Sequence, residues 1–112
     1  MRVFPIDGVA DQYERLSATL TSAVGFTSSK ILPTTGDFTG IHARSALISV
    51  ETADIRFTID GTTPTTTALG GAGHLLPFGS SYEINGEQNI TNFRCINAVA
   101  SNGAVLHCTY LF

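Results

Sequence analysis

Charged side chains are scarce in this sequence. They make up 13% of its 112 residues, whereas an ordinary soluble domain carries about 25%. A surface with so few charges tends to associate with other surfaces. The length of 112 residues predicts one domain. Because its surface carries so few charges, we expect that surface to be partly covered by neighbouring proteins in an assembly. The alternative is a neutral extracellular β-domain.

Basic residues are few, and they form no run. The formal net charge is −3, and the six basic residues are Arg2, Arg15, Lys30, Arg44, Arg56 and Arg94. Nucleic-acid binding relies on a basic patch or stripe that neutralises phosphates. This scatter argues against direct contact with nucleic acid and favours a protein partner.

Long apolar segments are also lacking. No apolar run approaches the roughly 20 residues that cross a bilayer, so we expect no membrane-spanning segment. The opening residues, Met-Arg-Val-Phe-Pro-Ile-Asp, lack the apolar core of a secretory signal peptide. We therefore expect the chain to fold in a reducing compartment.

Tryptophan is absent, and so are the short motifs of common active sites. Most Phe and Tyr residues fall at inward-facing positions of the expected strands, so an aromatic platform for sugar binding is poorly supplied. There is no Gly-x-Ser-x-Gly elbow, no phosphate-binding glycine loop with a following lysine, and no His-Glu-x-x-His. We expect no enzymatic activity, no catalytic residue and no cofactor.

Cysteine and histidine are too scattered for a metal site. Zinc sites use about four convergent ligands, usually arranged in two close pairs. The chain offers His42, His74, His107, Cys95 and Cys108 without such pairs. We therefore expect no bound metal.

From Arg44 onward, short β-like runs alternate with turn residues, which is typical of a sandwich or barrel. Ser45–Glu51 is apolar and β-branched, and Ile55–Ile59 alternates apolar with polar residues, the period of a half-buried strand. Because only Thr52–Asp54 separates the two runs, we predict that they form a hairpin.

A loop follows over Asp60–Thr65. Asp60 can cap backbone amides, Gly61 can take an unusual φ angle, and Pro64 excludes a central strand. We predict that this turn is structural and binds no ligand. The chain then continues through a glycine-rich stretch to another predicted strand, Ser81–Asn85.

The last third of the chain predicts a long β-hairpin. Its strands are Ile90–Val99 and Ala104–Phe112. A four-residue turn would place Cys95 opposite Cys108, whereas a two-residue turn would place Cys95 opposite Tyr110. Because the compartment is reducing and buried cysteines are common apolar core residues, we expect free thiols.

The apolar row of the first of these strands is interrupted by Asn97. A buried amide needs hydrogen-bond partners, so we expect Asn97 to lie at a sheet end or to bond to backbone across the strand. Period-2 alternation predicts a buried core that contains Leu47, Val50, Phe57, Ile59, Ile84, Phe93, Ile96, Val99, Leu106 and Tyr110.

The N-terminal third fits both helical and strand periodicity. We predict a short helix or an ordered arm over Gly8–Arg15, and a strand over Leu16–Ala23 because its β-branched residues favour extended structure. A second short strand is expected within Gly25–Leu32, and Pro33–Gly40 is predicted to be a loop.

We expect the chain to divide into an N-terminal arm, Met1–Arg15, and an all-β domain, an antiparallel β-sandwich, over Leu16–Phe112. Apolar residues at a chain end gain little by ordering unless they cover a surface. The arm is therefore assigned to an interface with a neighbouring subunit; the alternative is that it folds back onto its own sandwich edge. The predicted interface residues are Val3, Phe4, Pro5, Ile6 and Tyr13.

A resemblance adds to these patterns. The stretch from Arg44 to Thr65, followed by Gly73-His74-Leu75-Leu76, resembles small structural proteins encoded among the virion genes of tailed bacteriophages. The ending, with Ile90–Ile96, a short turn and Val105–Tyr110, resembles them too. The likeness covers residues 44 to 112.

The resemblance implies a jelly-roll-like sandwich that decorates or cements a phage capsid. Such a protein would lie on the capsid surface of the virion, after assembly in the host cytoplasm. Its partner would be the major capsid protein or another virion protein, and it would self-associate as a homotrimer. A neck, tail or fibre position is the alternative.

A second resemblance concerns the Ig-like domain appended to some chitin- and hexosamine-degrading enzymes. That domain has a strand that ends in Thr-x-Asp-Gly-Thr-x-Pro-Thr, and Thr58–Thr65 matches this pattern. It implies a carbohydrate-binding or receptor-binding β-module as the alternative function.

Overall fold

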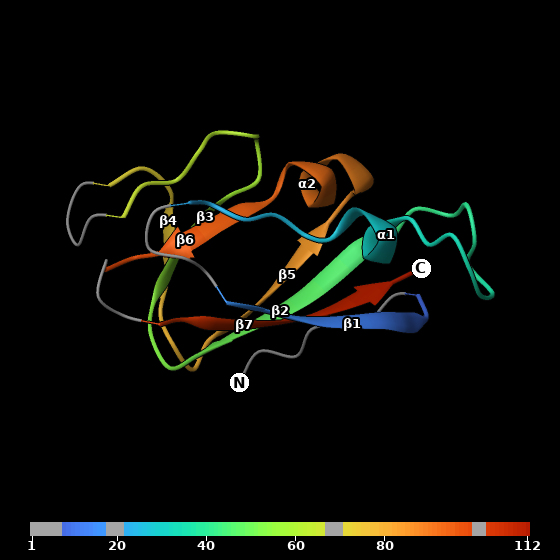
Figure 1. Ribbon diagram of the computed structural model, residues 1–112, viewed down its shortest axis with the longest axis horizontal. Helices are drawn as coiled ribbons and strands as arrows, with labels where there is room; N and C mark the ends of the chain where they lie inside the picture. Colours follow the sequence, from blue (N-terminus) through green and yellow to red (C-terminus); the bar gives the residue numbers. More distant parts are fainter. Residues whose placement is uncertain (1–7, 18–21, 67–70, 100–102) are drawn as a thin grey trace.

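The described part of the chain forms two antiparallel sheets and two short helices (Figure 1). The computed structural model describes residues 8–17, 22–66, 71–99 and 103–112. Within them the strands are β1 (Ala10–Ser17), β2 (Ser45–Glu51), β3 (Ile55–Thr58), β4 (His74–Leu76), β5 (Ser81–Asn85), β6 (Arg94–Asn97) and β7 (Val105–Leu111), and the helices are α1 (Ser28–Ile31) and α2 (Glu87–Asn92). The predicted all-β class is confirmed as a mostly β, sandwich-like protein.

The four-stranded sheet has the order β1-β7-β2-β5 and the other sheet has the order β4-β3-β6. In β2 the alternation places Ala46, Ile48 and Val50 in the core, while Leu47 is only half-buried. The pairing of Ile48 with Cys108 sets the register of β2 against β7. Burial of one face of each strand fixes this register, because a shift by one residue would turn the apolar side chains outward.

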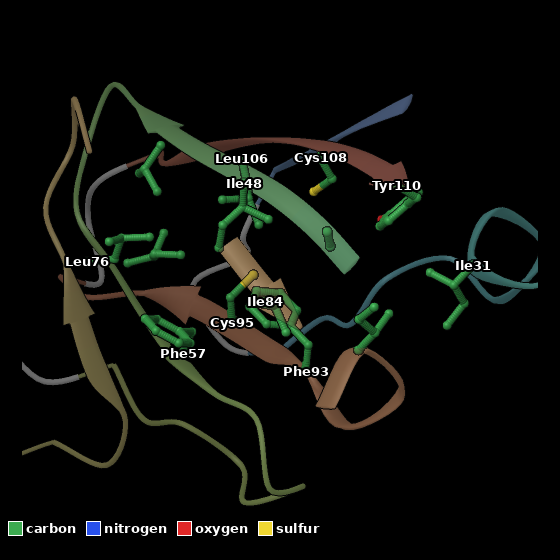
Figure 2. Close-up of a cluster of buried hydrophobic side chains, with 14 of the residues drawn as sticks. Ile31, Ile48, Phe57, Leu76, Ile84, Phe93, Cys95, Leu106, Cys108 and Tyr110 are labelled. Carbon is green, nitrogen blue, oxygen red and sulfur yellow. The ribbon is translucent and has the colours of Figure 1, made fainter. Parts of the chain in front are cut away.

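The core lies between the two sheets (Figure 2). Phe57 of β3 and Phe93, at the end of α2, face Tyr110 and Leu106 of β7 across it. The Phe93 ring stacks on Phe26 with the ring centres 4.2 Å apart, and the Phe26 ring in turn meets Tyr110 edge to face at 5.1 Å. Aromatic contacts therefore join the two layers.

The predicted hairpin of Ser45–Glu51 with Ile55–Ile59 is wrong. β2 belongs to the four-stranded sheet and β3 to the three-stranded sheet, so Thr52–Asp54 carries the chain from one layer to the other. Thr52 has a φ of +80°, which bends the chain sharply. Asp54 holds the corner, because its carbonyl accepts from the Ala98 amide at 3.1 Å and its carboxylate accepts from the Phe78 amide at 2.9 Å.

The predicted C-terminal hairpin is also wrong, because its two strands belong to different sheets. Its first strand begins late, since residues 87–92 form α2, and β6 pairs with β3 while β7 pairs with β1 and β2. The buried carboxamide of Asn97 accepts a hydrogen bond from the Ala104 amide at 3.0 Å. This bond confirms the expected side-chain to backbone contact and stabilises the crossing between the sheets.

Cys95 and Cys108 consequently lie in different sheets and point into the same core (Figure 2). Both are free thiols, as predicted. Burial raises the pKa of Cys95 to about 12 and raises the pKa of Cys108 as well. Both thiols therefore stay protonated at neutral pH and behave as small apolar core residues.

Of the two alternatives predicted for Gly8–Arg15, a short helix or an ordered arm, the helix is wrong, because Ala10–Ser17 forms β1 and pairs with β7. Part of the expected arm thus belongs to the protein's own sheet. Of the predicted strand over Leu16–Ala23, only Leu16 and Ser17 lie in β1, and residues 18–21 lie outside the described residues. The strand expected within Gly25–Leu32 is also wrong, since α1 occupies part of it, whereas the loop over Pro33–Gly40 is confirmed.

Glu14 explains why this segment is extended. It points inward from β1, and its carboxylate accepts from the Thr27 amide at 2.9 Å, from the Thr27 hydroxyl at 2.5 Å and from the Tyr110 hydroxyl. Every second residue of β1 is half-buried, which is the period of a strand and not of a helix. Burial, together with the Glu14 carboxylate, raises the pKa of Tyr110, so the phenol stays protonated and donates.

Most of the predicted core is confirmed. The buried residues are Val50, Phe57, Ile84, Phe93, Ile96, Leu106 and Tyr110. Leu47 and Ile59 are half-buried, and the prediction is wrong for Val99, which is 38% exposed. Val99 follows the end of β6, so strand alternation no longer controls where its side chain points.

We expect Phe93→Ala to lower the free energy of unfolding by about 3–5 kcal/mol, because it removes a fully buried ring and leaves a cavity. Urea denaturation gives this value directly. Val99→Ala is the matched control, and its cost should be below about 1 kcal/mol. A similarly small loss for Phe93→Ala would contradict the enclosed position of the ring.

We expect Glu14→Ala to cost about 2–3 kcal/mol, because it leaves the buried Tyr110 hydroxyl and the Thr27 amide without their charged acceptor. Denaturant unfolding measures the cost, and Gln88→Ala on the exposed side of α2 serves as the control. Equal stabilities of the two variants would show that the carboxylate does not hold β1 in place.

Candidate functional site

Of the residues predicted to form an interface, the structure describes Tyr13. Val3, Phe4, Pro5 and Ile6 lie outside the described residues. Tyr13 lies on the outer face of β1 and is 52% exposed. The assignment of Tyr13 to an interface stays a prediction.

Tyr13 is the first member of a hydrogen-bonded row across three strands of the four-stranded sheet. Its hydroxyl lies 2.5 Å from Nδ1 of His107 on β7, and Nε2 of His107 lies 2.9 Å from Oε1 of Glu51 on β2. A carboxylate can only accept, so Nε2 carries the proton that is donated to Glu51, and a neutral ring then accepts from Tyr13 through Nδ1. The row fixes the orientation of an exposed aromatic side chain.

A hollow of about 280 Å³ opens at the margin where β4 and β5 form the outer strands of the two sheets. We call it the margin groove. Its lining consists of Phe57, Ile59, His74, Leu75, Leu76 and Tyr82. The ring of Phe57 forms its floor, with the ring of Tyr82 at 5.3 Å and that of His74 at 5.6 Å.

A second, more polar hollow of about 350 Å³ adjoins the margin groove and shares Ile59 and His74 with it. Thr58, Asp60, Thr62 and Gly73 complete its lining. Together the two hollows bring aromatic rings, hydroxyls and one carboxylate onto one surface.

Asp60 caps a backbone amide in its turn, as predicted. Oδ1 of Asp60 accepts from the Thr62 amide at 3.0 Å, and the Thr58 hydroxyl donates to the Thr62 carbonyl. Gly61 has a φ of +89°, which glycine adopts without strain. The hydrogen bond from the Thr62 amide is the main reason why the pKa of Asp60 is lowered, so the carboxylate is charged at neutral pH.

A third hollow, of about 450 Å³, lies between the two helices and includes Ile31, Leu32, His42 and Thr91 in its lining. His42 donates from Nδ1 to the Ala43 carbonyl at 2.7 Å, while Nε2 lies 3.1 Å from the Thr91 hydroxyl. This histidine is therefore held by the fold. The three histidines of the sequence lie in three different places: the sheet face, the margin groove and this hollow.

Among the described residues, His, Cys, Asp and Glu side chains form no group of three or more that could hold a metal ion. The described helices include none that is both long and apolar enough to span a membrane.

The sequence pattern missed the margin groove. Its apolar members include Leu75, which is 49% exposed, and Tyr82, which is 38% exposed. Phe78, in the connection between β4 and β5, is 63% exposed and lies outside the groove lining. Tyr82 does share a face with Ile84, as the alternation predicts, yet it lies at the margin and not beneath the sheet. The signal in the sequence is Pro77, which follows His74–Leu76 directly and cannot donate to a strand ladder, so that β4 has only three residues to cover this margin.

We expect the Asp60 carboxyl to titrate below its ordinary value of 3.8. Because the folded pKa is depressed, the stability that Asp60 contributes is present above pH 3.8 and is lost as the pH falls through the folded pKa. The melting temperatures of the wild type and of Asp60→Ala should therefore converge in acid. A calcium-dependent rise in melting temperature that Asp60→Ala abolishes would contradict a purely structural turn.

Comparison of the sequence with models of protein families gives no match, and comparisons with curated proteins and with solved structures give no significant match either. The function is therefore inferred from the residues of the chain itself.

Proposed function

We propose that this chain is a non-enzymatic structural protein of a tailed-phage virion, a capsid decoration or cement protein that binds and stabilises the assembled capsid. Its partner is the major capsid protein or another virion protein at the capsid surface. The jelly-roll-like connectivity of such proteins is part of this proposal.

Exposed apolar side chains at the margin support the proposal most directly. Leu75, Phe78 and Tyr82 are 49%, 63% and 38% exposed. The centres of protein interfaces are enriched in Tyr and Phe and depleted of charged residues. Each of these side chains would gain stability by leaving water for an apolar partner surface.

The low charge of the chain points in the same direction. With 13% charged residues, a large part of its surface can be buried against a partner without the cost of removing charges from water. A subunit that is permanently covered in an assembly can keep such a surface, because it is not exposed to other proteins for long.

We expect purified protein to sediment with capsids assembled without it, and the double variant Leu75→Ser, Phe78→Ser to bind at least about tenfold more weakly. The expected loss reflects two apolar anchors that no longer enter the partner surface. The exposed polar residue Gln88 provides the matched control, Gln88→Ser, which should bind like the wild type.

Circular dichroism and melting curves of the variants must match those of the wild type, so that a binding defect is not a folding defect. If wild-type protein does not sediment with the capsids, the proposal fails. If the double variant binds as tightly as the wild type, the margin is not the docking surface.

A carbohydrate-binding or receptor-binding module is the second candidate, favoured by one observation. The margin groove and its polar neighbour place the Tyr82 ring and the Asp60 carboxylate on one connected surface. Sugars pack their C–H faces on aromatic rings and donate hydroxyl hydrogen bonds to carboxylates. Binding to a glycan array that Tyr82→Ala abolishes, together with unchanged capsid sedimentation of that variant, would favour this function.

A further inference from the structure

Among the described strands, β1 has a neighbour on one side only and forms an edge of the four-stranded sheet. It is eight residues long and is the terminal strand of its sheet, and in the described part of the chain β7 is its only strand partner. An unpaired edge of this length offers a row of backbone donors and acceptors to another strand. The edge strand at the other end of the sheet, β5, has only five residues.

The edge of the second sheet is different. Beyond β6, Val24 forms a bridge with Cys95, with the Val24 amide donating to the Cys95 carbonyl at 2.9 Å and the Cys95 amide donating back at 2.8 Å. This side of β6 is therefore partly covered. β1 is the longest edge that the described strands leave unpaired.

β1 is also held rigidly from both of its faces. On the inner face, Glu14 is bonded to Thr27 and Tyr110. On the outer face, the Tyr13 hydroxyl is bonded to His107. Just before the strand, Val9 exchanges two backbone hydrogen bonds of 2.9 Å with Phe112. A strand fixed in this way loses little further freedom when a partner binds.

The order of side chains along β1 is complementary to itself. Asp11, Tyr13 and Arg15 follow one another at every second position, and all three are exposed. Asp11 lies at a β-bulge in the pairing with β7, between Ala10 and Gln12. A negative, an aromatic and a positive side chain are thus presented in sequence at the open edge.

We propose that two copies of this chain pair through β1 as antiparallel strands, about a two-fold axis at Tyr13. In this register, Asp11 of each copy lies opposite Arg15 of the other, and the two Tyr13 residues lie opposite each other. Opposite charges directly across two strands stabilise their pairing. The two four-stranded sheets then form one continuous sheet.

Neighbouring registers lack this complementarity. An axis at Glu14 would place two carboxylates opposite each other, because in a two-fold antiparallel pair the residue on the axis faces itself. An axis at Gln12 would place Asp11 opposite Tyr13 and leave Arg15 opposite Val9. Only the axis at Tyr13 pairs both charges.

This inference adds a self-association surface to the proposed function and does not depend on capsid binding. A two-fold contact of this kind is complete with two copies, whereas the homotrimer implied by the phage resemblance needs a contact between two different surfaces. The mass of the protein in solution, measured without capsids, therefore distinguishes the dimer from the homotrimer.

The test is sedimentation velocity on the full chain over a range of concentrations, without capsids. The wild type should reach twice the chain mass of 11.8 kDa. Arg15→Asp and Asp11→Arg each place like charges opposite one another at two symmetric positions, and each should raise the dimer dissociation constant about tenfold or more. The double variant Asp11→Arg, Arg15→Asp exchanges the charges, restores both opposite pairs and should dimerise like the wild type.

Arg94→Asp makes the same charge change as Arg15→Asp on an exposed residue of β6 and should leave the dimer intact. A wild-type protein that stays monomeric, or forms a trimer, would overturn the inference. So would a double variant that is no better than the two single variants while all of them melt like the wild type. Because capsids are absent from these measurements, failure here leaves the sedimentation test of the proposed function unaffected.

Discussion

The carboxylate of Glu14 connects three parts of the chain that are far apart in sequence. It binds Thr27 through two donors and Tyr110 through a third, so β1, the segment that leads into α1, and β7 are held at one point. Phe26, next to Thr27, is thereby kept where its ring stacks on Phe93. The position of β1 and the packing of Phe26 between the layers are both tied to this one acceptor.

Local features of the fold could be predicted from the sequence, whereas the way strands pair could not. The apolar, β-branched composition of Ser45–Glu51 and the alternation along Val105–Leu111 identified strands, because both patterns reflect burial of strand side chains. Alternation carries no information about the partner of a strand. Both predicted hairpins therefore failed at connections that looked like tight turns, because Asp54 and Asn97 hold those connections as corners between two sheets.

In the candidate sites, too, local features could be predicted from the sequence, whereas contacts between distant segments could not. Tyr13 could be chosen from the sequence as a member of the N-terminal arm, but its bond to His107 joins residues 94 positions apart and has no local signal. The margin groove is built from β3, β4 and β5, and each of them contributes only a few lining residues. What could be predicted at that surface was the Asp60 turn, since all of its contacts lie within four residues along the chain.

The place of β7 has a consequence for synthesis. It is the last strand of the described chain, yet it lies in the middle of the four-stranded sheet, between β1 and β2 (Figure 1). β1 and β2 share no hydrogen-bonded ladder without it, so on the ribosome the nascent chain has no four-stranded sheet until β7 has emerged. The Tyr13–His107–Glu51 row also forms only at that moment. A chain released before β7 is made would lack both the four-stranded sheet and its ordered outer face. An assembly that binds this sheet or this face would therefore exclude incomplete copies.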